Sequence, residues 1–347
     1  VLPKDFVLEQ VDIRPCHLPA VPEKDFPLWL PPLGEYTASL TGYFRAQGVD
    51  AHALPHLSAH ALSLGRAETS AKEYLPFPAL LGGILAQQEV EPAPAQFLIP
   101  QTQGAEADGQ YARVIRAVLD RRKELNAQLV SPMLETLPAT AQDRDALFRA
   151  LLAGDILYAA PAAMRAGIAA AWDTLPGWAQ LHKAAVEIGR CPATGRRLAT
   201  VGTPLCLTEL DSGVLSTLEA EGSQLLRAPL SEALWFLWKD NMDANKPCAK
   251  WLEQMAQEMQ TIGAELGAHS TFAQDTAALF ETADTILPHF AGGNGRYRYA
   301  KAVELSGRAD AVLTLAPRYE NAATILDMRG LRDACKAPLF QLSLDND

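Results

Sequence analysis

The stretch from residue 95 to residue 120 constrains the fold more than any other part of the chain. It begins with the apolar run 97–99, which ends at Pro100, as a buried strand does where it can no longer donate a ladder hydrogen bond. Gly104 and Gly109 then bracket a polar loop. After the loop, one helical face carries a stripe of apolar side chains, at Tyr111, Val114, Ile115, Val118 and Leu119. A strand, a glycine-bearing turn and an amphipathic helix predict one unit of an open α/β sheet, and the loop 101–110 at its carboxyl edge is the first candidate site.

Similar units recur along the 347-residue chain. Strands are predicted near residues 28–30, 49–54, 97–99 and 128–131, and again near 198–201, 225–226, 309–315 and 339–344. Residues 140–187 have a helical pattern instead. We therefore predict an α/β protein with two small doubly wound parallel-sheet domains, flavodoxin-like or Rossmann-like, and a helical layer between them. The expected parts are a proline-rich extended arm (1–27), a first α/β domain (28–139), a helical segment (140–193) and a second α/β domain (194–347) with a helical insertion (230–290).

Composition narrows the classes of partner. Forty-one acidic and thirty basic residues give a net charge of −11, which argues against a nucleic-acid partner. No apolar run reaches the roughly 18 residues of a membrane span. The chain begins at Val1 without a signal sequence, so we expect either a processed chain or part of a longer one. The cysteines are far apart and never in CxxC spacing, which favours a reducing cytoplasm and offers no metal motif: Cys16, Cys191, Cys206, Cys248 and Cys335.

Three short segments occur in the order KEYLP, GAEADGQY and PRYENAAT, within longer matching segments over residues 28–345. They resemble the activase-related proteins of the 2-hydroxyacyl-CoA dehydratase superfamily, which includes the dehydratase subunits, benzoyl-CoA reductase relatives and double-cubane cluster proteins. Members of that family hold an iron–sulfur cluster with cysteines in loops such as KECYP, GPCRFGQY and PFGCMPGT. The resemblance places those three cysteine positions at Tyr74, Glu106 and Glu320.

The resemblance therefore implies a member that lacks the cluster ligands. Cluster ligation needs thiolate sulfur, which neither a phenol nor a carboxylate replaces. It implies no cofactor and no metal site in this chain, with a 4Fe-4S cluster only in a partner subunit. Tyr74, Glu106 and Glu320 remain the candidate catalytic residues. The loop scaffold that is retained marks the candidate cofactor-binding residues, which are Gly104, Gly109, Gln110 and Tyr111.

Two functions follow from this resemblance. The first is a non-catalytic subunit or scaffold of an ATP-dependent low-potential electron-transfer complex of anaerobic metabolism. Its partners would be a related cluster-bearing subunit, an ATP-dependent activator, or both, in a dimer or hetero-oligomer. The alternative is an enzyme that acts on an acyl-CoA or another small molecule, with Glu106, Glu320 or Tyr74 as acid or base. A plain small-molecule binder stays open as a third class.

Two basic clusters have competing interpretations. His52, His56 and His60 are four residues apart, which on a helix would form a metal-binding face. Pro55 interrupts any such helix, so an ordinary surface cluster is favoured. The glycine-rich run 292–295 precedes Arg296 and could begin a phosphate-binding helix, but it follows no strand. A tight turn beside a partner-facing basic patch, Arg296 to Tyr299, is the favoured interpretation.

Two further features are assigned to packing. Cys191 has no paired histidine, and an inert thiol is favoured. Trp235, Trp238 and Trp251 lie in a predicted amphipathic helical insertion and are assigned to the core or to a subunit interface. Together with the proline-rich arm, this insertion is expected to add apolar surface for a partner.

Overall fold

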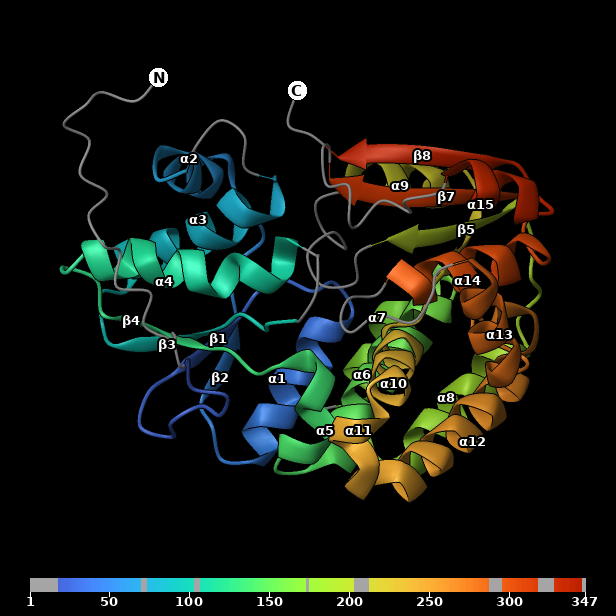
Figure 1. Ribbon diagram of the computed structural model, residues 1–347, viewed down its shortest axis with the longest axis horizontal. Coiled ribbons are helices and arrows are strands. Elements are labelled where there is room, and N and C mark those ends of the chain that lie inside the picture. The colour runs from blue at the N-terminus through green and yellow to red at the C-terminus, as the bar shows by residue number, and fades with distance from the viewer. Residues whose placement is uncertain are drawn as a thin grey trace, which may run out of the picture.

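The computed structural model describes residues 18–69, 74–102, 107–172, 175–202, 212–286, 295–317 and 328–344. Two four-stranded sheets lie at opposite ends of the molecule, with a helical layer below and between them in the view of Figure 1. Every strand pair in both sheets is parallel. The prediction of an α/β fold with two parallel-sheet units and a helical layer is confirmed. Among the described helices, none is long and apolar enough to cross a membrane.

The first sheet has the strand order β2-β1-β3-β4. Its strands are β1 (Leu28–Leu30), β2 (Ala51–Ala53), β3 (Ala95–Leu98) and β4 (Ala127–Val130). In Figure 1, α1 (Tyr36–Ala46) lies on one side of this sheet, and α2 (Ala59–Ala67), α3 (Pro76–Val90) and α4 (Tyr111–Arg121) lie on the other. Side chains alternate accordingly, because Leu28 and Leu30 pack with α1 whereas Phe97 packs with α3 and α4.

The second sheet repeats this arrangement in the order β6-β5-β7-β8. Its strands are β5 (Arg197–Gly202), β6 (Gln224–Arg227), β7 (Ala311–Pro317) and β8 (Leu339–Leu344). Helix α9 (Ser212–Ala220) contributes Leu215 to one apolar cluster of this sheet, and α14 (Gly295–Ser306) and α15 (Met328–Ala334) contribute Leu305 and Leu331 to another. Both faces of the second sheet are therefore covered as well.

The helical layer holds the largest hydrophobic core, which is continuous with the α1 face of the first sheet. Its helices are α5 (Leu137–Thr140), α6 (Arg144–Ala159), α7 (Ala162–Ala170), α8 (Trp178–Gly189), α10 (Leu230–Asp240), α11 (Met242–Asn245), α12 (Ala249–Leu266) and α13 (Thr276–Ile286). Short 3₁₀ helices are η1 (Ala107–Gln110), η2 (Leu134–Thr136), η3 (Lys246–Cys248) and η4 (Gly267–His269). Trp235, Trp238 and Trp251 are buried in this core. Of the two assignments, core or subunit interface, the core is confirmed for these three residues, because α6, α10 and α12 of the same chain enclose them. A partner surface on this insertion stays a prediction.

The described end of the N-terminal arm, residues 18–27, lies along the first sheet. The Pro19 carbonyl accepts from the Ser131 amide at 2.6 Å, and the Pro27 carbonyl accepts from the Gln96 amide at 2.8 Å. The Gln96 side chain also bonds to both backbone groups of Glu23. The Pro27 bond continues the β1–β3 ladder by one residue, whereas the bonds of Pro19 and Glu23 tie the arm to β3 and to the end of β4. Residues 1–17 lie outside the described part of the chain.

Candidate functional site

The strand order of the first sheet creates a switch point between β1 and β3. The chain leaves β1 toward β2 on one side and later returns to β3 on the other, so the two connections diverge at the carboxyl edge. In open α/β sheets this gap is where ligands bind. Here the gap is lined by Pro31 after β1, by the segment 99–102 after β3, and by Tyr111 and Leu134. The lining of this gap includes Gln101 and Thr102, the first two residues of the loop 101–110 that the sequence identifies as a candidate site.

The polar groups at the switch point form bonds within the chain. Gln101 continues the sheet beyond β3, since its amide donates to the Pro132 carbonyl and its side-chain Nε2 donates to the Ser131 carbonyl at 3.0 Å. The Thr102 hydroxyl donates to the Glu135 carboxylate at 2.5 Å, and both residues are buried. These contacts fix the path of the chain where it leaves β3.

Gly109 and Tyr111 hold the far end of the same loop. A Cβ atom at Gly109 would lie 2.4 Å from the Thr102 carbonyl oxygen, so only glycine allows this close approach of loop and strand end. Tyr111 is buried, and its ring lies 5.4 Å from that of Phe77. Gln110 is exposed. The structure thus assigns packing roles to Gly109 and Tyr111, and their binding of a cofactor stays a prediction.

Tyr74 is half-buried just before α3, where its carbonyl accepts from the Phe77 amide at 2.9 Å. Gly104, Glu106 and Glu320 lie outside the described residues. The convergence of Tyr74, Glu106 and Glu320 therefore stays a prediction. The cavity that the described residues leave at the switch point measures about 30 Å³. Typical ligand pockets are larger, at roughly 300–1,000 Å³.

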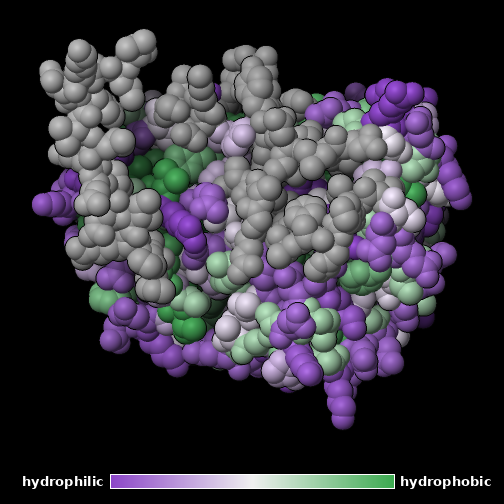
Figure 2. Space-filling model, viewed as in Figure 1, coloured by the Kyte–Doolittle hydropathy of each residue, from purple (hydrophilic) through white to green (hydrophobic). Residues whose placement is uncertain are grey.

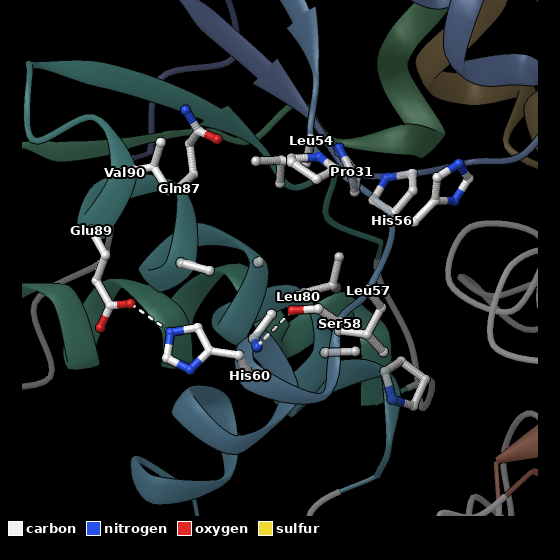
Figure 3. Close-up of a pocket in the computed structure, with 17 residues that line it drawn as sticks. Pro31, Leu54, His56, Leu57, Ser58, His60, Leu80, Gln87, Glu89 and Val90 are labelled. Atoms are coloured by element: carbon white, nitrogen blue, oxygen red, sulfur yellow. Dashed lines mark hydrogen bonds and ion pairs between the residues drawn. The ribbon is translucent and has the colours of Figure 1, made fainter.

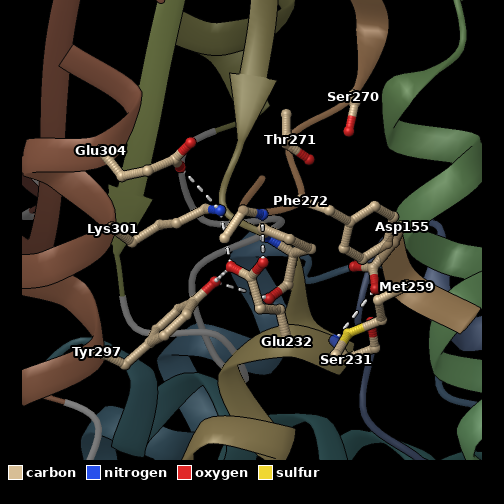
Figure 4. A network of polar contacts seen from close by, with 12 residues as sticks. Asp155, Ser231, Glu232, Met259, Ser270, Thr271, Phe272, Tyr297, Lys301 and Glu304 are labelled. Atoms are coloured by element: carbon tan, nitrogen blue, oxygen red, sulfur yellow. Dashed lines mark hydrogen bonds and ion pairs between the residues drawn. The ribbon is translucent and has the colours of Figure 1, made fainter. Parts of the chain in front are cut away.

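A second polar cluster lies where the carboxyl end of β6 enters α10 (Figure 4). Glu232 and Lys301 are fully buried and form an ion pair, with Oε1 and Nζ 2.7 Å apart. The other Glu232 oxygen accepts from the Ala273 amide at 2.6 Å, and the Tyr297 hydroxyl donates to Oε1 at 2.9 Å. Glu304 also pairs with Lys301, at 3.0 Å. Each charge of the cluster is thus paired within the chain. The same contacts join α10, α14 and the segment 270–273.

Asp155 on α6 completes this polar region. Its carboxylate accepts from the amides of Leu230 (2.7 Å) and Ser231 (3.1 Å) at the start of α10, and from the Tyr36 hydroxyl at 2.6 Å. Burial raises the pKa of Asp155 to about 6, although hydrogen bonds from Ser231 and Tyr36 act in the opposite direction. Burial, followed by the nearby Asp155 charge, raises the pKa of Tyr36 well above its usual value. Asp155 does not line the switch-point cavity. Its contacts hold the start of α10 against α6 and α1.

Sequence reasoning did not single out Asp155 or the Glu232–Lys301 pair. A usable signal was present, because Asp155 is an acid within the otherwise apolar stretch 150–160. A charge on a helix that is apolar all round must find an internal partner.

The interpretation of Arg296 as part of a partner-facing basic patch was wrong. Arg296 and Arg298 are both buried. The Arg296 guanidinium pairs with Asp240 of α10 and Asp284 of α13, because the first turn of α14 lies between these two helices. Residues 292–294 of the glycine-rich run lie outside the described residues.

The three histidines do not share a helical face. His52 is on β2 and pairs with Asp50 at 2.8 Å, His56 is in the following loop, and His60 is in the first turn of α2. This arrangement excludes the metal-binding helix face. Within the described ranges, no three His, Cys, Asp or Glu side chains are grouped in a way that could hold a metal ion.

The described cysteines are spread through the fold. Cys248 is buried, whereas Cys191 and Cys335 are half-buried, and none of these three is in a disulfide. Burial raises the pKa of the Cys335 thiol. Cys16 and Cys206 fall outside the part of the chain that the structure describes.

No family model, curated protein or solved structure matches this chain. The resemblance to the dehydratase superfamily therefore rests on the sequence segments alone.

Proposed function

We propose that this chain is a cluster-free member of the activase-related 2-hydroxyacyl-CoA dehydratase superfamily. It acts as a non-catalytic subunit or scaffold of an ATP-dependent low-potential electron-transfer complex. The observation that carries the proposal is the joint replacement of three ligand positions, by Tyr74, Glu106 and Glu320, in a chain with two parallel-sheet units. A cluster needs thiolates at those positions, and none of these side chains supplies one.

The described polar groups at the switch point suit a structural role. Gln101 and Thr102 bond to the chain's own groups, and the cavity that the described residues leave there is about 30 Å³. Gly109 and Tyr111 meanwhile keep the loop packed against the strand end. A scaffold that retains its loops without their reactive groups suits docking to a partner that holds the cluster.

The partner in this proposal is a related subunit with a 4Fe-4S cluster, an ATP-dependent activator, or both. Isolation from the source under gentle anaerobic conditions, followed by native mass spectrometry, tests this assembly. We expect the chain in a complex that contains iron and sulfide. A monomer that turns over an acyl-CoA by itself would instead support the enzyme alternative.

Cysteine restoration tests the assignment of the three positions. The purified wild-type chain should bind no stoichiometric iron or sulfide after anaerobic reconstitution. The triple variant Tyr74→Cys, Glu106→Cys, Glu320→Cys should bind a cluster and gain visible absorbance. A control variant carries the same number of new thiols on exposed helical positions: Val114→Cys, Lys183→Cys and Val214→Cys.

Two results of that comparison would contradict the assignment of the three positions. A stoichiometric cluster in the wild-type chain would contradict a cluster-free member. Equal iron uptake by the triple variant and its control would show that the three loops do not converge, and it would remove the basis of the resemblance.

A further inference from the structure

A cavity of about 300 Å³ lies beside the switch point, at the carboxyl ends of β1 and β2 (Figure 3). Helices α2 and α3 form its other walls. Most of its lining is apolar or small, and includes Pro31, Leu54, Leu57, Ala79, Gly83 and Val90. Ligand pockets in proteins have volumes of roughly 300–1,000 Å³ and are mostly apolar with a few polar groups. This cavity meets both conditions, in contrast to the switch-point cavity.

The space exists because α2 and α3 touch through backbone while α3 presents short side chains to the cavity. A Cβ atom at Gly82 would lie 1.9 Å from the Ala61 carbonyl oxygen, and one at Gly65 would lie 1.9 Å from that of Pro78. The next residue, Gly83, instead faces the cavity, where a Cβ would meet only Leu54 Cδ1 at 3.6 Å. The helix crossing is therefore fixed at one side of α3, and the adjoining side is left unfilled.

The volume sets the size of the occupant. A cavity of roughly 150 Å³ lined by apolar side chains holds one benzene molecule. Twice that volume holds a molecule of about two fused rings. Hydrophobic surface continues outside the cavity, since Val90 at its rim is 82% exposed. In Figure 2, a hydrophobic area is visible at the upper left of the molecule, near the position of α3 in Figure 1. Burial of such carbon surface drives the binding.

The polar rim contains one carboxylate, Glu89, and the imidazoles of His56 and His60. His60 of α2 and Glu89 of α3 are joined at one side of the cavity, with Nε2 and Oε2 2.7 Å apart (Figure 3). Glu89 thus places a carboxylate at the rim of a chain with a net charge of −11. This carboxylate can accept a hydrogen bond and repels a second negative charge.

The two helices that border the cavity present few amide donors for an anion at their first turns. The side chain of Ser58, the N-cap of α2, already accepts from the Ala61 amide at 3.0 Å. Helix α3 begins with Pro76 and has a second proline at Pro78, and proline has no amide hydrogen to donate. A phosphate or carboxylate would therefore find few of the donors that usually bind it at a helix start.

We propose that this cavity is a binding site for a small neutral molecule of about two fused rings that carries a hydroxyl or N–H donor. The rings lie between α3 and the ends of β1 and β2, and the donor bonds to Glu89. This site is independent of the proposed subunit role, because it uses none of the three former ligand positions.

Calorimetric titration of the full chain with 2-naphthol tests the site, and 2-naphthoate serves as the anionic counterpart of the same ring size. We expect saturable 1:1 binding of 2-naphthol and about tenfold weaker binding of 2-naphthoate, because its carboxylate loses hydration in an apolar cavity and is repelled by Glu89. Glu89→Gln should reduce this difference. Gly83→Leu should weaken 2-naphthol binding about tenfold or more by filling the cavity, whereas the control Gly83→Ala should retain it.

Circular dichroism and a denaturation curve show that each variant is folded. Undiminished 2-naphthol binding by folded Gly83→Leu would overturn the proposal, because the ligand would then bind elsewhere. Absence of binding to the wild-type chain, or tighter binding of 2-naphthoate than of 2-naphthol, would overturn it as well.

Discussion

The same substitution to alanine should change the stability of the protein in opposite directions at Gly82 and Gly83, two consecutive residues of α3. Alanine in place of glycine stabilises a helix interior by about 1 kcal/mol, and this gain is common to both positions. At Gly83 the new methyl group meets Leu54 at 3.6 Å, which is ordinary contact. At Gly82 it would lie 1.9 Å from the Ala61 carbonyl oxygen. Restoring a contact of 3.4 Å needs α2 and α3 to separate by about 1.5 Å.

Such overpacking costs roughly 1–3 kcal/mol or more, because the interface between the two helices has no free space to absorb it. We therefore expect Gly83→Ala to raise the free energy of unfolding by up to about 1 kcal/mol and Gly82→Ala to lower it by up to about 2 kcal/mol. Urea denaturation followed by circular dichroism measures both, and equal m-values would show that the unfolded states are comparable. Equal stabilisation by the two substitutions would refute the backbone contact between α2 and α3, and with it the origin of the 300 Å³ cavity.

Helix α6 offers two further tests. Gly154→Ala should destabilise the fold by up to about 2 kcal/mol after the gain in helix propensity, because its Cβ would lie 2.0 Å from the buried Tyr36 ring. The matched control Gly167→Ala on α7 meets nothing within 4 Å and should stabilise slightly in the same denaturation assay; the same response of both variants would contradict the packing at Tyr36. The second test is pH. Burial raises the folded-state pKa of Asp155 to about 6, above its ordinary value. The protonated side chain therefore contributes fully to the free energy of unfolding below about pH 4, and this contribution is lost as the pH rises through about 6. The stability of the wild-type chain relative to Asp155→Asn should fall by about 2 kcal/mol between about pH 4.5 and 7.5, and a constant difference would contradict the raised pKa.

The strands could be predicted because their signals are local. β1 stops before Pro31 and β3 stops shortly before Pro100, and both strands are apolar on the two faces that helices cover. Most of the other strands also coincide with a short apolar run, and the exception is β2, in which His52 stands between two alanines. The pattern alone therefore predicted both sheets, since parallel sheets buried on both faces need such runs.

The buried charges could not be predicted in the same way. Arg296 finds its acidic partners at positions 240 and 284, and Lys301 finds Glu232 on another helix. A sequence window around the basic residues contains none of these partners, so exposure is the natural expectation. The large cavity was missed for a related reason, because Gly82 and Gly83 are equivalent in sequence and differ only in what faces them.

The charges around α10 also explain why an anion site is absent from the helix start that looks best placed for one. α10 follows directly on the carboxyl end of β6, which is where doubly wound folds bind phosphate at helix N-termini. Here the carboxylate of Asp155 accepts from the amides of Leu230 and Ser231, the donors that a ligand would use. An internal carboxylate thus takes the position of an external anion and locks α6 to α10. The result is a helix start held by the protein's own acid, in which the contact between α6 and α10 replaces ligand binding.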